Sequence, residues 1–367
     1  MEIAPWLKSL IIAFTAIPIT YNVNLVQTME LEGMIPLIGF SILLGVVMVM
    51  YFLLRENRPH DPFYYFYTLA SFGAICSMLI ALEADKYING FFAFYFKNGE
   101  VYLTTPYGAL CSYWDGTGHL AMYLLMMRAI SNKQNYRILG LYWAGSLINS
   151  MIVLLVGSVV GNFGIKSAYL MNMPWFIFPI IATGCFLKQR PNQSISVKMA
   201  NEHHVTIFQR PQDIFFILYL VAALVVSIIR GFSLLGCDME FFTSYLSNIE
   251  PYLNDPASYG KMQGFVYFFY FSLYYVMAIY GFLSPGQSWM VDWSMIHAGA
   301  AIQSQVCFIG GALYPRTPAD FRVKMFPQGN MWFWLINLGL AIVPQLIAYR
   351  CYNQRKFFTP QVSKKQY

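Results

Sequence analysis

Long apolar runs separated by short polar segments dominate the sequence. A transmembrane helix needs about 20 mostly apolar residues, and ten runs meet that length. They are residues 6–26, 34–54, 63–82, 107–130, 138–160, 168–187, 214–235, 264–282, 289–313 and 331–349. The pattern predicts an all-α polytopic membrane protein with about ten transmembrane helices. Pro18, Tyr21 and Asn22 are unlike a signal-peptide cleavage site, so we expect the first run to be retained as a span.

The composition agrees with that pattern and excludes several classes of protein. Hydrophobic residues make up 57% of the chain and charged residues only 11%, against roughly 25% charged in a soluble domain. The six cysteines show neither paired nor metal-type spacing, so no disulfide framework or metal site is expected. The net charge of +6 is dispersed among loops, which argues against nucleic-acid binding. Without a hydrolase elbow or a phosphate-binding glycine loop, no cofactor is expected either.

The distribution of Lys and Arg predicts the orientation. Cytoplasmic loops of membrane proteins keep an excess of these residues. If both termini face the cytosol, the cytosolic side has about twice as many of them as the other side. The loop that contains Arg316, Arg322 and Lys324 goes against the rule. We therefore expect both termini to be cytosolic.

One polar loop segment occurs twice, 150 residues apart. Residues 100–106 read EVYLTTP and residues 250–256 read EPYLNDP, and the same offset aligns Trp143 with Trp293. We predict two tandem parallel four-helix repeats, an arrangement known in some transporters. The predicted domains are an N-terminal two-helix hairpin (1–60), a first four-helix module (61–187), a cytosolic linker (188–212), a second four-helix module (213–350) and a cytosolic tail (351–367).

Ionisable residues inside spans are costly, so each one is a candidate functional group. Asp115 lies eight residues inside the fourth predicted span, about 12 Å deep. His119 lies on the same helix face at i+4, and Trp114 adds an indole N–H. Glu83 closes the third predicted span. These residues indicate either a ligand pocket in the first module or a structural hydrogen-bond cluster.

The second module differs chemically from the first. Gln263 lies near the position that corresponds to Asp115, and the acid itself is absent there. Arg230 lies in the seventh predicted span at a depth similar to that of Asp115, so an ion pair between the two is one possible arrangement. His297, Gln303 and Gln305 follow the ninth predicted span, where hydrogen bonding between helices is the expected role.

Several motifs together resemble the transmembrane 6 superfamily over nearly the whole chain. They are YWDGT at 113–117, GLYW at 140–143, EPYL at 250–253, YPRTP at 314–318 and AYRC at 348–351. The resemblance implies two EXPERA modules, the four-helix unit of the emopamil-binding sterol isomerase. The isomerase pattern of two acids matches Glu83 and Asp115, but Leu79 stands where the isomerase has a histidine.

The resemblance also implies a function. Lys364 and Lys365 resemble the di-lysine signal that coat proteins bind, which favours an endoplasmic reticulum member of the family over its lysosome-associated member. The implied role is loading of neutral lipid into secreted lipoproteins, which limits lipid droplets, with lipoprotein-assembly proteins as further partners. The implied location is the endoplasmic reticulum membrane, with the ER–Golgi intermediate compartment as a second site.

Three functions remain open at this stage. The first is non-enzymatic binding of a sterol or other lipid, with Glu83, Trp114, Asp115, His119, Arg230 and Gln263 as candidate ligand contacts. The second is an isomerase-like enzyme, in which Glu83, Asp115 and His119 would exchange protons with a sterol. The third is a lipid transporter or scramblase, suggested by the parallel repeats. The missing histidine at Leu79 favours binding without turnover.

Overall fold

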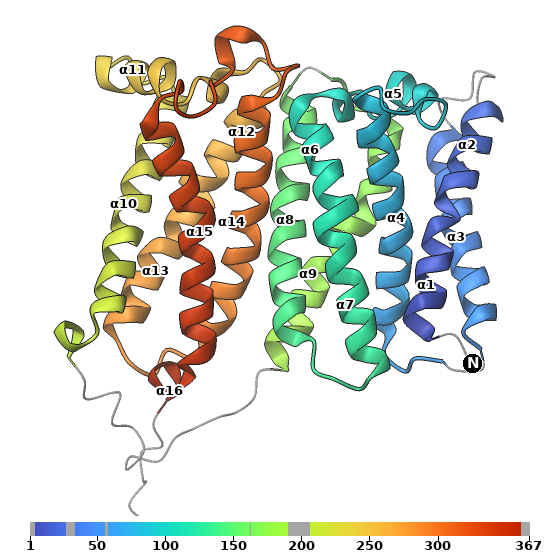
Figure 1. Ribbon diagram of the computed structural model, residues 1–367, viewed down its shortest axis with the longest axis horizontal. Helices are drawn as coiled ribbons and strands as arrows, with labels where there is room; N and C mark the ends of the chain where they lie inside the picture. Colours follow the sequence, from blue (N-terminus) through green and yellow to red (C-terminus); the bar gives the residue numbers. More distant parts are fainter. Residues whose placement is uncertain (1–3, 27–33, 56–57, 162, 190–205, 361–367) are drawn as a thin grey trace, which may run out of the picture.

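The computed structural model describes residues 4–26, 34–55, 58–161, 163–189 and 206–360. Within these ranges the chain forms helices and no β-strand. The long helices run side by side in one elongated bundle, and short helices and loops cover its ends (Figure 1). Most of the predicted linker, and Lys364 and Lys365, lie outside the described residues.

The N-terminal segment forms two apolar spans at one edge of the bundle. The first consists of α1 (Pro5–Phe14) and α2 (Ala16–Val26), and the second is α3 (Ile35–Leu53). Inside the protein, the Thr68 hydroxyl of α4 donates to Ser9 Oγ at 2.9 Å, and Ser9 Oγ donates to Tyr64 at 3.1 Å. These polar contacts fix α1 against the rest of the bundle.

The first four-helix group follows. It contains α4 (Pro62–Ala84), α6 (Pro106–Trp114), α7 (Leu120–Ser131), α8 (Arg137–Val160) and α9 (Met173–Lys188), with α6 and α7 joined through a single π-helical turn, η3 (Asp115–His119). Asp61 caps α4, where Pro62 takes the first position, and Thr105 caps α6. The short helix α5 (Ala93–Asn98) and two 3₁₀ turns, η2 (Val101–Thr104) and η4 (Ser167–Asn172), complete the group. We call the end of the bundle that bears α5 the α5 end.

The second group has a similar order of elements. It contains α10 (Pro211–Leu234), α11 (Glu240–Asn248), α12 (Tyr259–Val266), α13 (Ser272–Leu283), α14 (Trp289–Leu313), α15 (Met331–Asn353) and α16 (Arg355–Phe358). A π turn, η9 (Tyr267–Phe271), joins α12 to α13, and the 3₁₀ turns are η7 (Ile207–Gln209), η8 (Pro251–Asn254) and η10 (Ala319–Phe321). The start of α1 and helix α16 lie at the same end of the molecule (Figure 1).

Nine helices in the described residues are long and apolar enough to span a membrane, one fewer than the ten runs in the sequence. The difference is the fourth predicted span, which corresponds to α6, η3 and α7. This path runs alongside α4 and α8 from one end of the bundle to the other (Figure 1), but its middle is the polar sequence of η3. Because that sequence includes Asp115 and His119, the segment is less apolar than its neighbours.

The two groups share local features at offsets close to 150 residues. The turns η2 and η8 start 150 residues apart, and the π turns η3 and η9 start 152 residues apart. At Gly108 an added Cβ would lie 2.5 Å from the backbone oxygen of Tyr102. At Gly260 it would lie 2.4 Å from the backbone oxygen of Tyr252. These matched features support tandem repeats, and the division into modules stays a prediction.

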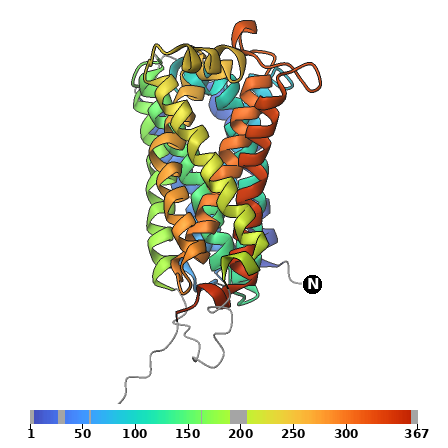
Figure 2. The ribbon, with the colours of Figure 1, turned by 90° about the vertical axis from the view of Figure 1, so that its left-hand side faces the viewer.

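Helices α8 and α14 join the two groups face to face. An added Cβ on Gly145 or on Gly299 would lie 1.9 Å from a backbone oxygen of the other helix, Ile296 or Tyr142 respectively. Only glycine permits such close approach of two helix backbones. Figure 2, turned by 90° about the vertical axis, views the bundle from the side of the second group, with the first group behind it.

Candidate functional site

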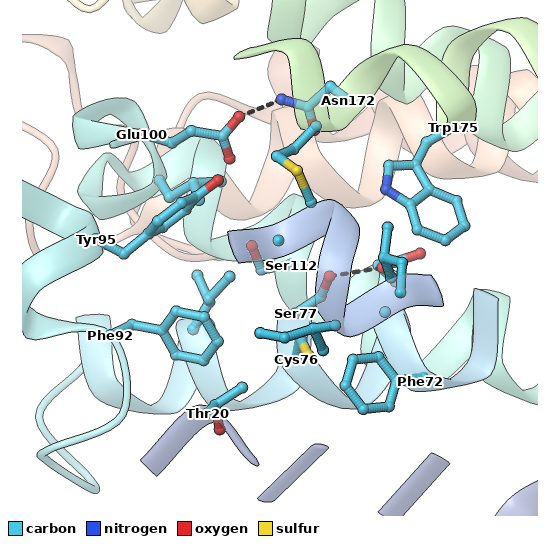
Figure 3. A pocket seen from close by; sticks show the side chains of 18 of the residues that line it. Thr20, Phe72, Cys76, Ser77, Phe92, Tyr95, Glu100, Ser112, Asn172 and Trp175 are labelled. Atoms are coloured by element: carbon cyan, nitrogen blue, oxygen red, sulfur yellow. Dashed lines mark hydrogen bonds between the residues drawn. The ribbon is translucent and has the colours of Figure 1, made fainter. Parts of the chain in front are cut away.

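A cavity of about 260 Å³ lies in the first group, toward the α5 end. Side chains from α2, α3, α4, α6, α8 and the start of α9 line it, and α5 and η2 close it at the end of the bundle. Most of the lining is aliphatic or aromatic (Figure 3). The polar residues among the lining are Thr20, Asn24, Ser77, Tyr95, Glu100, Tyr102, Ser112, Asp115, Tyr123, Ser150 and Asn172.

Asp115 lines this cavity from the π turn η3. Ser77 Oγ donates to Asp115 Oδ2 at 2.7 Å, a bond drawn in Figure 3, and His119 Nδ1 lies 2.9 Å from Asp115 Oδ1. A quarter of the Asp115 side chain remains accessible. Gly116 permits this geometry, because an added Cβ would lie 2.7 Å from Met78 Cβ on α4. Single π turns inside α-helices are often found at functional sites.

His119 lies behind Asp115, away from the cavity lining. Its Nε2 lies 2.8 Å from Ser146 Oγ on α8, and Trp114 Nε1 donates to the same hydroxyl at 3.0 Å. In the tautomer with the proton on Nδ1, His119 donates to Asp115 and its Nε2 accepts from Ser146, which itself accepts from the indole. Asp115, His119, Ser146 and Trp114 thus form one hydrogen-bonded chain that orients the carboxylate.

Glu83 is not part of the cavity lining. Its carboxylate accepts the backbone N–H groups of Gly90, Phe91 and Phe92 at 2.7–3.0 Å. Phe91 and Phe92 do line the cavity. Glu83 therefore holds the loop that closes the cavity, and both of its oxygens are occupied by backbone donors.

Arg230 and Gln263 lie elsewhere. The predicted ion pair between Arg230 and Asp115 does not form. Arg230 is buried against Glu250, with Nε 2.7 Å from Oε2 and Nη2 2.5 Å from Oε1. The reason is that Glu250 belongs to the same group of helices as Arg230. Gln263 accepts from Tyr107 at 2.9 Å and contacts Asn149 between the two groups, outside the cavity lining.

The structure adds residues that sequence reasoning did not select. Glu100 is 5% exposed and lines the cavity, and Asn172 donates to its Oε1 (Figure 3). Trp175 lies near them on α9, and Thr20 and Asn24 reach the cavity from the N-terminal span. The signal for Glu100 was present, because it begins the loop segment that recurs 150 residues later, but that segment indicated only a repeat.

Ser150 and Ser112 complete the polar lining between α8 and α6. Ser112 donates to the Gly108 carbonyl at 3.0 Å, inside its own helix. In the described residues, no three His, Cys, Asp or Glu side chains are grouped closely enough to hold a metal ion. Chemically, the site is an apolar chamber with two carboxyl groups, Asp115 and Glu100, each held by hydrogen bonds from neighbouring side chains.

The fold and the cavity together define a polytopic all-α membrane protein with a polar-edged chamber between its helices. A family model described as transmembrane 6 superfamily member 2-like, transmembrane domain, matches residues 15–197. Transmembrane 6 superfamily member 2 of Mus musculus is 35% identical over 366 residues, and that of Homo sapiens is 34% identical over 364 residues. Each match covers 98% of this chain and 96% of the relative.

The same protein of Rattus norvegicus is 34% identical over 366 residues. This chain therefore belongs to the transmembrane 6 superfamily. No solved structure matches it.

Proposed function

We propose that this protein is a regulator of lipid homeostasis in the endoplasmic reticulum membrane, acting as member 2 of its family. It promotes the loading of neutral lipid into secreted triglyceride-rich lipoproteins and thereby limits lipid droplets. It acts by binding a sterol or another lipid in the cavity of the first group. The observation that supports this most directly is an apolar chamber with Asp115 in its wall, inside a protein of this family.

A ligand explains why Asp115 is retained. A carboxylate inside a membrane span costs several kcal/mol unless it has partners. Ser77 and His119 supply two hydrogen bonds, yet part of the Asp115 side chain remains accessible beside the cavity. A lipid hydroxyl that donates to that exposed part supplies the missing partner. A volume of about 260 Å³ lies just under the usual range for small-molecule sites, about 300–1,000 Å³, and is suited to one slender lipid or to one end of a larger one.

Binding is favoured over isomerase activity by the geometry around Glu83. Moving a sterol double bond needs an acid and a base that both reach the ring system. The Glu83 oxygens accept three backbone N–H groups, and the residue is absent from the cavity lining. Asp115 therefore faces the cavity without Glu83, the acid that the isomerase pattern pairs with it.

The location and orientation are part of the same proposal. The excess of Lys and Arg supports cytosolic termini, so the α5 end and the cavity face the lumen, where lipoproteins are assembled. Lys364 and Lys365 act as the retrieval signal. Replacing both with alanine is expected to move the protein beyond the endoplasmic reticulum, as fluorescence microscopy of tagged protein would show.

Photo-crosslinkable sterol and lipid probes test the pocket directly. We expect labelling of the unmodified protein to fall about fivefold or more in Asp115→Asn, which keeps size but removes the charge. Asp238→Asn, at an exposed position outside the spans, is the control and should label normally. In lipoprotein-secreting cells, Asp115→Asn should lower triglyceride secretion and enlarge lipid droplets. Equal labelling of the Asp115→Asn variant and the unmodified protein would refute the pocket.

A further inference from the structure

Each group of helices contains one buried glutamate at the same place. Glu100 precedes η2 and Glu250 precedes η8, exactly one 150-residue offset apart. Their side chains are 5% and 0% exposed. Since a buried carboxylate needs partners, the two sites can be compared partner by partner.

Glu250 is fully neutralised. Arg230 binds both of its oxygens, Tyr245 donates to Oε2 at 2.8 Å, and Asn337 Nδ2 donates to Oε1 at 2.8 Å. The Arg230 side chain is 1% exposed and lies 4.6 Å from the Tyr267 ring centroid. The second group thus encloses one cation, one tyrosine and one asparagine around its glutamate.

Glu100 has the neutral partners but not the cation. Asn172 donates to Oε1 and also to the Tyr102 hydroxyl, and the Tyr95 and Tyr102 phenols lie beside the carboxyl group. Among the residues that the structure describes, no ion pair includes Glu100. The position 150 residues before Arg230 is Ile80, which lines the cavity together with Glu100. By this offset, an apolar side chain and open volume lie beside Glu100, whereas Glu250 has an arginine beside it.

We propose that the cavity binds a lipid whose polar end is a protonated amine, and that this ammonium group pairs with Glu100 as Arg230 pairs with Glu250. The hydrocarbon part of the lipid lies against Ile80 and the aromatic wall of the chamber. This inference rests on the proposed lipid-binding function and specifies the chemistry of the ligand at its second carboxyl group.

An amine fits this position better than a hydroxyl group does. A hydroxyl donates one hydrogen bond and leaves the carboxylate charge without a counter-charge in a low-dielectric site. An ammonium group supplies hydrogen bonds and a compensating charge together, and charge-assisted bonds are about twice as strong as neutral ones. Burial raises the pKa of Glu100 to about 7, so without a cation the group is only partly ionised near neutral pH. A bound ammonium favours the ionised form.

The first test compares two photo-crosslinkable probes of equal chain length, a long-chain primary amine and the matching alcohol. With the unmodified full-length protein in lipid nanodiscs at pH 8, we expect the amine probe to label about tenfold more than the alcohol. Glu100→Gln should abolish that preference while it keeps labelling by the alcohol. Glu240→Gln, an acid exposed on α11, is the matched control and should keep the preference.

The second test builds the missing cation into the first group. Ile80→Arg should pair with Glu100, fill the cavity and reduce labelling by both probes about tenfold, while the melting temperature stays near that of the unmodified protein. In a Glu100→Gln background the same arginine loses its Glu100 partner, so the double variant should melt several degrees lower. That comparison separates a filled pocket from a misfolded protein.

The possible outcomes distinguish this inference from the function on which it rests. If sterol or alcohol probes label the cavity through Asp115 but the amine shows no preference, or Glu100→Gln leaves it unchanged, the amine assignment is wrong and the lipid pocket stands. If no probe labels the cavity, both are wrong. Glu100-dependent labelling by the amine supports both.

Discussion

At the scale of single residues, the Arg230–Glu250 pair is the clearest source of stability in the second group. Removing one partner of a buried pair costs about 3–5 kcal/mol, because the remaining charge is left without compensation. We expect Arg230→Met to lower the melting temperature of the purified protein strongly, and the double variant Arg230→Met, Glu250→Gln to recover much of the loss. Thermal unfolding followed by intrinsic fluorescence measures both.

A matched control for that prediction is Arg316→Met. Arg316 Nη2 lies 2.7 Å from Asp85 Oδ1, but the arginine side chain is 33% exposed. Pairs accessible to water contribute about 0–1 kcal/mol. A loss in Arg316→Met as large as that in Arg230→Met would contradict the assignment of stability to burial.

Glu100 makes the stability of the ligand-free protein depend on pH. Because burial raises its pKa from 4.5 to about 7, the folded state binds the proton more tightly than the unfolded state. The resulting stabilisation is fully present below about pH 4.5 and is lost as the pH rises through 7. We expect Glu100→Gln to melt roughly 2–5 °C above the unmodified protein at pH 8, with the difference shrinking toward pH 5.5.

The other ionisable groups near Glu100 do not produce this dependence. Tyr95, Tyr102 and Tyr169 face it from α5, η2 and η4. Burial raises the pKa of Tyr95 and Tyr102 well above the usual phenol value, so both stay neutral between pH 5.5 and pH 8. Asp115 is the second acid of the cavity, and it is retained in both proteins that are compared. A difference in melting temperature that stayed constant from pH 5.5 to pH 8 would mean that Glu100 does not titrate in this range.

At the scale of helices, the contact between α8 and α14 depends on two glycines. Gly145 and Gly299 each bring a helix backbone so close to the other that an added Cβ would lie 1.9 Å from a carbonyl oxygen. Overpacking typically costs about 1–3 kcal/mol. We expect Gly145→Ala and Gly299→Ala each to lower the melting temperature.

Two other helical glycines provide the control. An added Cβ at Gly184 on α9 or Gly339 on α15 would meet nothing within 4 Å. Alanine is favoured over glycine inside a helix by about 0.5–1 kcal/mol, so Gly184→Ala and Gly339→Ala should be neutral or slightly stabilising. If all four variants behaved alike, close approach of α8 and α14 would not be the cause.

The helices were predictable from the sequence because hydropathy is a local property. The apolar runs locate nine spans, and Pro62 and Pro211 stand at the first positions of α4 and α10. Which charged side chains pair with each other was harder to predict. Arg230 has a depth similar to that of Asp115, but its actual partner Glu250 lies in a loop segment that folds back onto α10.

The same limit applies to the candidate site. Asp115 was found because a charge inside an apolar run is visible in the sequence. The donors to Glu83 are backbone groups of residues 90–92, which no side-chain pattern identifies. The cavity requires the packing of α2 and α3 against the first group, and the order of apolar runs does not determine which helices become neighbours.

At the scale of the whole molecule, polar contacts join the two groups along the full length of their interface. Arg137 on α8 binds Asp292 on α14 at 2.7 Å near one end, and Asn149 donates to Gln303 in the middle. At the α5 end, Arg316 and Tyr314 both bind Asp85. Together with the close α8–α14 packing, these contacts predict that the groups hold together without a covalent connection.

A protease site inserted between residues 190 and 205 tests this in the folded full-length protein. After cleavage in mild detergent, both fragments should elute together on size exclusion. The Arg137 side chain is 8% exposed and that of Asp292 is 2% exposed. Replacing Arg137 with an uncharged residue should therefore lower the temperature at which the fragments separate. Arg316→Met, at the more exposed pair, should change that temperature much less. Separation of the unmodified fragments immediately after cleavage would contradict this prediction. It would mean that the covalent linker, and not the α8–α14 interface, holds the two groups together.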